Sequence, residues 1–180
     1  MPANSLKIFL KLDTIEGEST VKGHEKEIVV LSYEQGLEVA TSAGGGGGGG
    51  GAASGRARFS GVRIRKDVDK ASIPMMLACA SGKVLRQAVF NFRRNPGGFD
   101  FYKVTLEEVL ITKFVQRAGT EAQYPLTFEA LNAGDPTNGF LDEASFTFSR
   151  IRWEHRTQRA NGSVGVTTSG GWDLRTNRPL

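Results

Sequence analysis

The stretch that decides the fold runs from residue 6 to residue 12 and reads Leu6-Lys7-Ile8-Phe9-Leu10-Lys11-Leu12. Leucine or isoleucine occupies every second position, and Lys7 and Lys11 fall between them. Successive side chains of a β-strand point to opposite faces, so this alternation predicts a strand with one buried and one solvated face. The period of two is typical of an antiparallel β protein and not of alternating strand-helix units.

Similar signals recur along the chain. Residues 25–33 contain a β-branched run, and residues 58–66 alternate Val62 and Ile64 with arginines, so both stretches predict strands. Residues 88–92 and 102–106 flank the turn sequence Asn95-Pro96-Gly97-Gly98, which predicts a hairpin.

The later strands are less regular. The alternation breaks at Glu107-Glu108-Val109, which predicts a bulge that re-aims a long strand, with the two glutamates on the surface. A short strand is predicted at 124–128 and another at 144–149, which continues to Ile151 and Trp153 beyond a second bulge. The chain then ends in a glycine-containing tail.

One helix is predicted at about residues 72–82. Ser72 suits the N-cap, Pro74 suits the first turn, and Gly82 ends the helix. Four apolar residues at helical spacing are expected to pack on the sheet: Ile73, Met76, Leu77 and Ala80. Met75 and Cys79 are expected to be packing residues, since no histidine lies near them in the sequence.

These elements predict a single domain over residues 1–180. Its fold class is mainly β: a compact antiparallel β-barrel or two-sheet sandwich of about seven strands with one short α-helix. A chain of 180 residues is long enough to bury a substantial core and short for two independent domains.

The amino-acid composition of the chain limits the classes of function that it can have. The single cysteine, Cys79, excludes an internal disulfide framework and a cysteine-rich zinc cluster. No stretch approaches the ~18 apolar residues of a membrane span, so no stable membrane insertion is expected. The N-terminus lacks an apolar signal core, so we expect assembly in the cytoplasm and any export to proceed without a cleaved signal peptide.

Residues 36–55 are predicted to form an extended glycine-rich loop that contains eight consecutive glycines, Gly44 to Gly51. It does not match a phosphate-binding loop, which needs spaced glycines before Gly-Lys-Ser/Thr. The one Gly-Lys pair, Gly82-Lys83, has Leu77 in place of the first glycine and Val84 in place of the hydroxyl residue.

Two alternative functions stay open on the residues alone. The net charge of +4 and the basic residues between Arg56 and Lys66, interleaved with Phe59, allow a small nucleic-acid-binding β-barrel. The opposing interpretation is that these arginines line the outer face of a strand, since no second aromatic residue alternates with them. A small hydrolase with an unrecognised site is the other alternative, although no Gly-x-Ser-x-Gly motif supports it.

Several blocks, in order along the chain, resemble the Hcp proteins, the haemolysin-coregulated tube subunits of type VI secretion systems. The blocks are Phe9-Leu10-Lys11-Leu12-Asp13, Ile15-Glu16-Gly17-Glu18-Ser19, Gly23-His24, Val68-Asp69-Lys70-Ala71-Ser72 running into 77–83, Leu106-Glu107-Glu108-Val109-Leu110, 146–151, and Gly171-Trp172-Asp173-Leu174 with Asn177. The resemblance spans nearly the whole chain.

The resemblance implies a fold similar to phage tail-tube proteins and a structural, non-enzymatic role without a cofactor. Copies would close into hexameric rings that stack into a hollow tube, which is propelled out of the cell and carries effector proteins in its lumen. Implied partners are further copies of this chain and the sheath, baseplate and spike of the secretion machine, with no nucleic acid.

The resemblance also implies roles for named residues. Because glycines supply no side-chain contacts, ring stacking would fall to the flanks of the tract: Glu38, Val39, Ala40, Thr41, Ser42, Ala52, Ala53, Ser54, Arg56 and Arg58. The structural motif residues would be Asp13, Gly17, Glu18, Ser19, Gly23, His24, Asp69, Lys70, Ser72, Gly82, Gly171, Trp172, Asp173 and Leu174. Trp172 is expected to dock on the body of the fold.

Overall fold

The computed structural model describes residues 5–41, 54–95, 98–118, 140–159 and 162–180. Within these ranges the chain forms ten strands and one helix. In chain order they are β1 (Ser5–Leu12), β2 (Ile28–Val30), β3 (Ser32–Thr41), β4 (Ser54–Asp67), α1 (Ser72–Ser81), β5 (Val84–Asn95), β6 (Phe99–Ala118), β7 (Phe140–Thr147), β8 (Arg150–Gln158), β9 (Val164–Asp173) and β10 (Arg178–Pro179).

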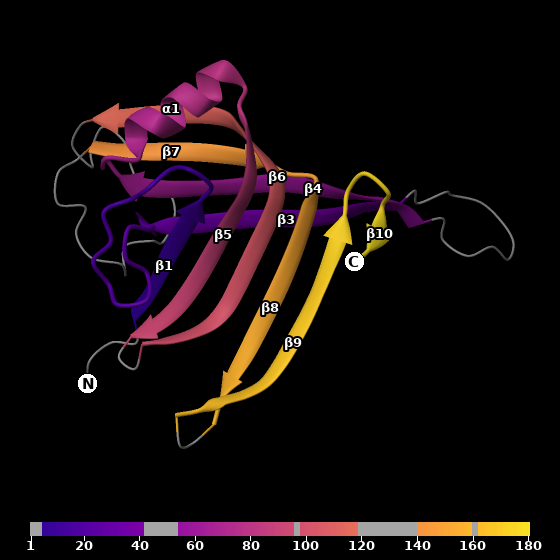
Figure 1. The fold of residues 1–180 in the computed structure, drawn as a ribbon. Helices are drawn as coiled ribbons and strands as arrows, with labels where there is room; N and C mark the ends of the chain where they lie inside the picture. The colour runs from indigo at the N-terminus through magenta and orange to yellow at the C-terminus, as the bar shows by residue number, and fades with distance from the viewer. Residues whose placement is uncertain (1–4, 42–53, 96–97, 119–139, 160–161) are drawn as a thin grey trace, which may run out of the picture.

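The strands are arranged around the long strand β6 (Figure 1). One path of neighbours runs β10-β9-β8-β6-β5-β1-β2, and a second leaves β6 through β7 and β4 to β3. β6 changes partner near Glu108: its residues 102–107 pair with β8, and its residues 110–118 pair with β7. Glu108 has φ 54°, and the strand changes partner there as predicted. The predicted bulge is misplaced, because β6 keeps its register with β5 at residues 107–109 and shifts against β7 between Ile111 and Lys113.

The predicted fold class is confirmed as a mainly β, antiparallel two-sheet arrangement with one helix. Of the two predicted forms, the described strands build the open one, because the sheets are not closed into a barrel. β2 pairs with β1, β3 pairs with β4, and the chain changes partner between them at Leu31.

The core lies between the two sheets. The alternation in β1 buries Ile8, Leu10 and Leu12 as predicted, where they join inward-facing residues of the neighbouring strands. Among these are Phe90, Leu106, Phe146 and Ile151. Phe9 is also buried although it lies on the lysine side of the strand, because His24 covers its ring.

Several predicted boundaries are corrected by the structure. The strand at 25–33 is split into β2 and the start of β3, and the loop predicted at 36–55 is shorter because β3 continues to Thr41 and β4 begins at Ser54. The C-terminal segment is not only a tail, since most of it forms β9 on the edge of β8. Backbone pairing between neighbouring strands extends them beyond what side-chain alternation reveals. The short strand predicted at 124–128 lies outside the described residues.

The helix is found where it was predicted and ends at Gly82, which adopts the left-handed conformation (φ 62°). Two details of the prediction are wrong. Ala71, not Ser72, is the N-cap, and the buried face consists of Ser72, Met75 and Ala78. The predicted contact residues Ile73 and Leu77 are 65% and 64% exposed. The helix carries apolar residues on all of its sides. Their spacing in the sequence therefore did not identify the side that faces the sheet.

Within the described residues, no helix has both the length and the apolar character that crossing a bilayer requires.

Candidate functional site

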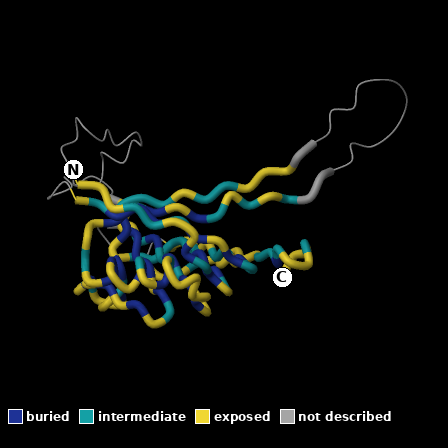
Figure 2. Tube along the Cα trace, turned by 90° about the horizontal axis from the view of Figure 1, so that it is seen from above, coloured by how far each residue is buried: buried dark blue, intermediate teal, exposed yellow. Residues whose placement is uncertain are grey.

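The most prominent feature of the surface is the hairpin of β3 and β4, which projects beyond the body of the molecule (Figure 2). Leu37 lies opposite Phe59, and Val39 lies opposite Ala57. Phe59 packs on the core beside Trp153 and Phe148, so Leu37, Val39 and Ala57 continue the core-facing side of the sheet outward. Leu37 is 54% and Val39 46% exposed. We call this surface the hairpin inner face.

Most of the predicted stacking residues lie in the two described strands of the hairpin. Glu38, Val39, Ala40 and Thr41 lie in β3, and Ser54, Arg56 and Arg58 lie in β4. Glu38 faces Arg58 across the ladder, on the side opposite the hairpin inner face. Ser42, Ala52 and Ala53 lie outside the described residues. The structure therefore brings the described residues of the two flanks together as paired strands.

The motif Gly17-Glu18-Ser19 fixes the loop between β1 and β2. The backbone N–H of Gly17 donates to Lys26 O at 2.7 Å, and that of Ser19 donates to Glu27 O at 3.0 Å. A Cβ on Gly17 would lie 2.4 Å from Glu27 O, so only glycine allows this close approach. Glu18 accepts the backbone N–H of Lys70, which ties the loop to the start of α1.

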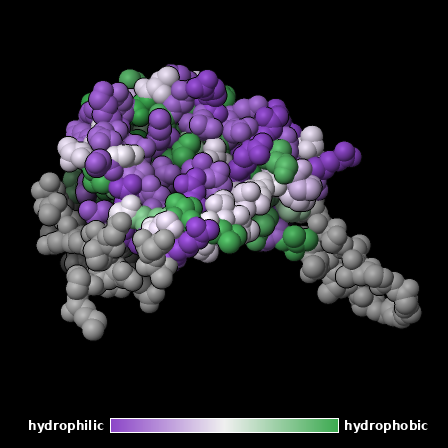
Figure 3. All heavy atoms as spheres, turned by 60° about the horizontal axis from the view of Figure 1, so that its bottom comes forward, coloured by the Kyte–Doolittle hydropathy of each residue, from purple (hydrophilic) through white to green (hydrophobic). Residues whose placement is uncertain are grey.

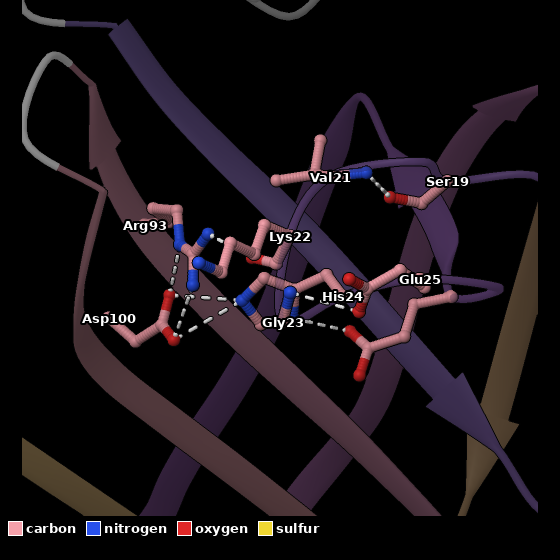
Figure 4. Close-up of polar contacts among 9 residues, drawn as sticks. Ser19, Val21, Lys22, Gly23, His24, Glu25, Arg93 and Asp100 are labelled. Atoms are coloured by element: carbon pink, nitrogen blue, oxygen red, sulfur yellow. Dashed lines mark hydrogen bonds and ion pairs between the residues drawn. The ribbon is translucent and has the colours of Figure 1, made fainter.

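His24 connects the same loop to the hairpin of β5 and β6 (Figure 4). Its Nδ1 lies 2.7 Å from Glu27 Oε2, and its Nε2 lies 3.1 Å from Asp100 Oδ1. The ring stacks parallel on Phe9, with 4.2 Å between centroids. Arg93 Nε donates to Asp100 Oδ1 at 2.6 Å, and Arg93 Nη1 donates to the carbonyl of Lys22.

Each ring nitrogen of His24 lies within hydrogen-bond distance of one carboxylate group, Nδ1 beside Glu27 and Nε2 beside Asp100. Burial is the largest influence on Asp100 and raises its pKa, but the hydrogen bonds from Arg93 and His24 outweigh it, so the pKa of Asp100 is lowered from 3.8. This partly buried cluster holds the loop against the hairpin of β5 and β6.

We expect Asp100→Asn to lower the free energy of unfolding by roughly 1–3 kcal/mol at neutral pH, because the hydrogen bonds that join its carboxylate to Arg93 and His24 weaken. A lowered folded pKa means that the carboxylate stabilises the fold above its unfolded pKa and that this stabilisation is lost as pH falls through the folded pKa. Denaturant unfolding from pH 7 downward should therefore show the gap between the two proteins narrowing below about pH 4. Glu34→Gln, at a half-exposed pair with Arg63, is the matched control with little expected effect. A gap that stays constant to pH 2 would contradict this account.

Lys66 lies at the centre of a second buried cluster, which anchors α1. Its Nζ lies 2.9 Å from Asp142 Oδ2, 2.8 Å from Asp69 Oδ1 and 3.0 Å from Ser72 Oγ. The Ser72 hydroxyl donates to Asp142, and Gln116 donates to the other oxygen of that carboxylate. Lys66 and Asp142 are both 0% exposed. Ser72, expected as a helix cap, instead joins the helix to β4 and β7 through this network.

A serine beside a lysine is also the arrangement of some nucleophilic hydrolases. Here the ammonium of Lys66 donates to two carboxylates, which leaves it no role as a base, and Ser72 is 2% exposed. These contacts hold the helix on the sheet.

The closing motif docks β9 on the body of the fold, as predicted. Trp172 lies opposite Ile151 and packs against the core, and Leu174 packs beside it. Asp173 accepts hydrogen bonds from Arg150 Nε and from the backbone N–H groups of Thr176 and Arg175, and these lower the pKa of Asp173 to about 2. Gly171 has no room for a Cβ, which would lie 2.9 Å from Ile151 O.

The basic stretch of β4 is largely neutralised within the fold. Arg63 lies 3.6 Å from Glu34, Arg65 lies 3.5 Å from Glu143, and Lys66 is buried between carboxylates. Phe59 packs on Trp153 and is not a free platform for a base. Arg58 is exposed, and the side chain of Arg56 lies outside the described residues. These contacts do not favour a nucleic-acid site.

In the part of the chain that the structure describes, no group of three or more His, Cys, Asp or Glu side chains is arranged to hold a metal ion. Several of the predicted motif residues shape turns and helix ends: Asp13, Gly23, Asp69, Lys70 and Gly82. For example, Asp69 Oδ1 accepts the backbone N–H of Ala71, and the side chain of Lys70 lies 3.3 Å from Glu16.

Two acidic residues that complete these clusters, Asp100 and Asp142, were not predicted from the sequence. Asp100 and Asp142 each lie 76 residues from the residue that they bind, His24 and Lys66. Within its own stretch of sequence, each of these aspartates has the pattern of a surface residue. Only the sheet register brings them to their partners, so no local signal was available.

Comparison with known proteins agrees with this architecture. The model of the family described as "Type VI secretion system effector, Hcp" matches residues 9–155. Protein hcp1 of Pseudomonas aeruginosa is 28% identical over 176 residues, which cover 96% of this chain and 98% of that protein. Among solved structures, a type six secretion system protein superposes with a TM-score of 0.80 at 24% identity, covering 98% of this chain and 100% of the other. Hcp1 from Salmonella typhimurium gives a TM-score of 0.73 at 22% identity, covering 98% and 99%.

Proposed function

The chain belongs to the Hcp family of type VI secretion proteins, and from that premise we propose that it is a structural subunit of the inner tube of the secretion machine. Membership of this family implies export from the cell by the type VI system. In the proposal, copies assemble in the cytoplasm into hexameric rings, the rings stack into a hollow tube, and the tube is propelled outward. The subunit works mechanically, with no catalytic step and no cofactor.

The observation that supports this best is the projecting hairpin together with two free strand edges. Among the described residues, β3 pairs only with β4, and β9 has a partner on its outer side only at its last two residues. Unpaired edges promote pairing with other chains unless they are covered. A ring covers such edges by a head-to-tail contact that repeats until it closes.

The finer roles follow from the same proposal. The hairpin flanks contact the adjacent ring, and the sheath, baseplate and spike of the machine surround or cap the tube. Effector proteins occupy the lumen. The His24 and Lys66 clusters hold the subunit rigid enough to transmit force, since each joins elements that are distant in sequence.

Shortening the hairpin is the test of its stacking role. Replacing residues 38–56 by a short turn should leave folding and ring closure intact, because the core lies outside this segment. Tube formation and secretion should fall strongly. The readouts are tube length by negative-stain microscopy and the amount of protein in the culture medium.

A matched variant tests the role of the eight consecutive glycines separately from the role of the strands on either side of them. Changing only Gly44 to Gly51 to a glycine-serine sequence of equal length keeps the flanks and should be exported like the wild type. If the shortened variant still forms long tubes and reaches the medium at wild-type levels, the hairpin is not a stacking element.

A further inference from the structure

The outer face of α1 is exposed and largely apolar. Ile73, Pro74, Leu77 and Ala80 are exposed along it, and the ten residues of the helix include no charged side chain. A helix at a protein surface normally presents charged or polar residues to water, and one that is apolar all round is normally buried. We call these four residues the helix outer face.

Scattered apolar residues elsewhere on the surface are not unusual in the way that the helix outer face is. Figure 3 shows the face at the bottom of Figure 1, where apolar side chains lie in small groups among hydrophilic ones. Such a mixture is ordinary for a soluble surface. The helix outer face differs because its apolar residues are continuous along one element.

The same chain carries a second uncovered apolar surface, the hairpin inner face. Leu37 and Val39 are separated by two strand positions, and Ile73 and Leu77 by four helix positions, so each pair spans about 6–7 Å. The polar side of the hairpin is internally balanced, with Glu34 near Arg63 and Glu38 opposite Arg58. Its apolar side is the part left without a partner.

Both faces are exposed in one subunit, so they do not cover each other within it. Figure 1 shows the hairpin leaving the body on the side away from α1. Every copy therefore offers one of each surface, on different sides, which is the requirement for a head-to-tail contact between identical chains. A few side chains bury on the order of a few hundred Å², well below the roughly 1,200 Å² of a stable interface, so the contact would act within a larger assembly.

We propose that the helix outer face is the docking surface for the hairpin inner face of a second copy of this chain. Leu37 and Val39 pack against Ile73 and Leu77, and Ala57 fills the space beside them. This inference rests on the proposed tube function and adds the receptor for the hairpin. It also explains why the helix is apolar on the side away from its own sheet.

Disulfide trapping between two populations tests the contact. In a Cys79→Ala background, one population carries Val39→Cys and the other, with a larger tag, carries Leu77→Cys. Equimolar mixtures under conditions that allow assembly are oxidised with diamide, and the mixed dimer is measured on non-reducing gels and by peptide mass spectrometry. Val39→Cys mixed with Val166→Cys, at a residue 71% exposed on β9, is the matched control.

We expect the Val39/Leu77 mixture to give at least about tenfold more mixed dimer than the control, since docking raises the effective concentration of the two thiols. Native mass spectrometry of the same samples reports ring formation independently. Rings without preferential trapping overturn the inference and leave the tube function standing. Preferential trapping without rings supports the contact and counts against the tube function. If neither preferential trapping nor rings are found, both the contact and the tube function are overturned. Preferential trapping with Val166→Cys instead would assign the hairpin to β9 and overturn the inference.

Discussion

Replacing Lys66 by methionine is expected to destabilise the fold by about 3–5 kcal/mol, because it leaves a fully buried carboxylate without its cation. Asp142 is 0% exposed and would keep only Ser72 and Gln116 as donors. The hydrocarbon part of methionine fills much of the space of the lysine side chain, so the loss reports the charge rather than a cavity. Denaturant unfolding followed by tryptophan fluorescence measures it.

Two controls separate charge from packing at this position. The double variant Lys66→Met/Asp142→Leu removes both charges and should recover much of the lost free energy, because a buried ion pair contributes little net stability over apolar residues of similar size. Lys83→Met, at an exposed lysine beyond the helix, should change stability by less than about 0.5 kcal/mol. If Lys66→Met is as mild as Lys83→Met, the buried pair does not hold the helix as described.

Trp172→Ala is expected to cost about 3 kcal/mol, the lower end of the range for large aromatic core residues, because the ring is only partly buried. The indole Nε1 is buried and has no hydrogen-bond partner among the described residues. Removing that donor recovers part of the cost, since an unpaired buried N–H is itself unfavourable. The shift in melting temperature measures the loss.

Trp172→Phe is the informative comparison. Phenylalanine keeps most of the apolar ring and has no N–H, so its effect should stay within about 1 kcal/mol of the wild type. An alanine variant that melts at the wild-type temperature would show that β9 is not docked through this side chain.

The sequence predicted those elements whose signal is local. The alternation at residues 6–12, the hairpin around residues 95–98 and the stop at Gly82 each depend on side chains close in the chain, and each is found in the structure. The face of α1 was predicted wrongly because its apolar residues surround the helix. Its orientation is set by Ser72, which the buried cluster draws inward.

The motif residues were recognisable, but their contacts were not. Gly17 and Gly171 stand out as motif glycines, and the structure supplies the reason, since a Cβ at either position would meet backbone atoms. The carboxylates that complete the His24 and Lys66 clusters come from strands placed by register. Register is a property of the assembled sheet, so no single stretch contains it.

Native mass spectrometry of the purified protein, with negative-stain microscopy of the same sample, shows whether the subunits close into rings. We expect a six-subunit species at physiological salt and ring-shaped particles with a central hole. A sample that remains monomeric at high concentration, with no rings on the grid, would contradict this expectation.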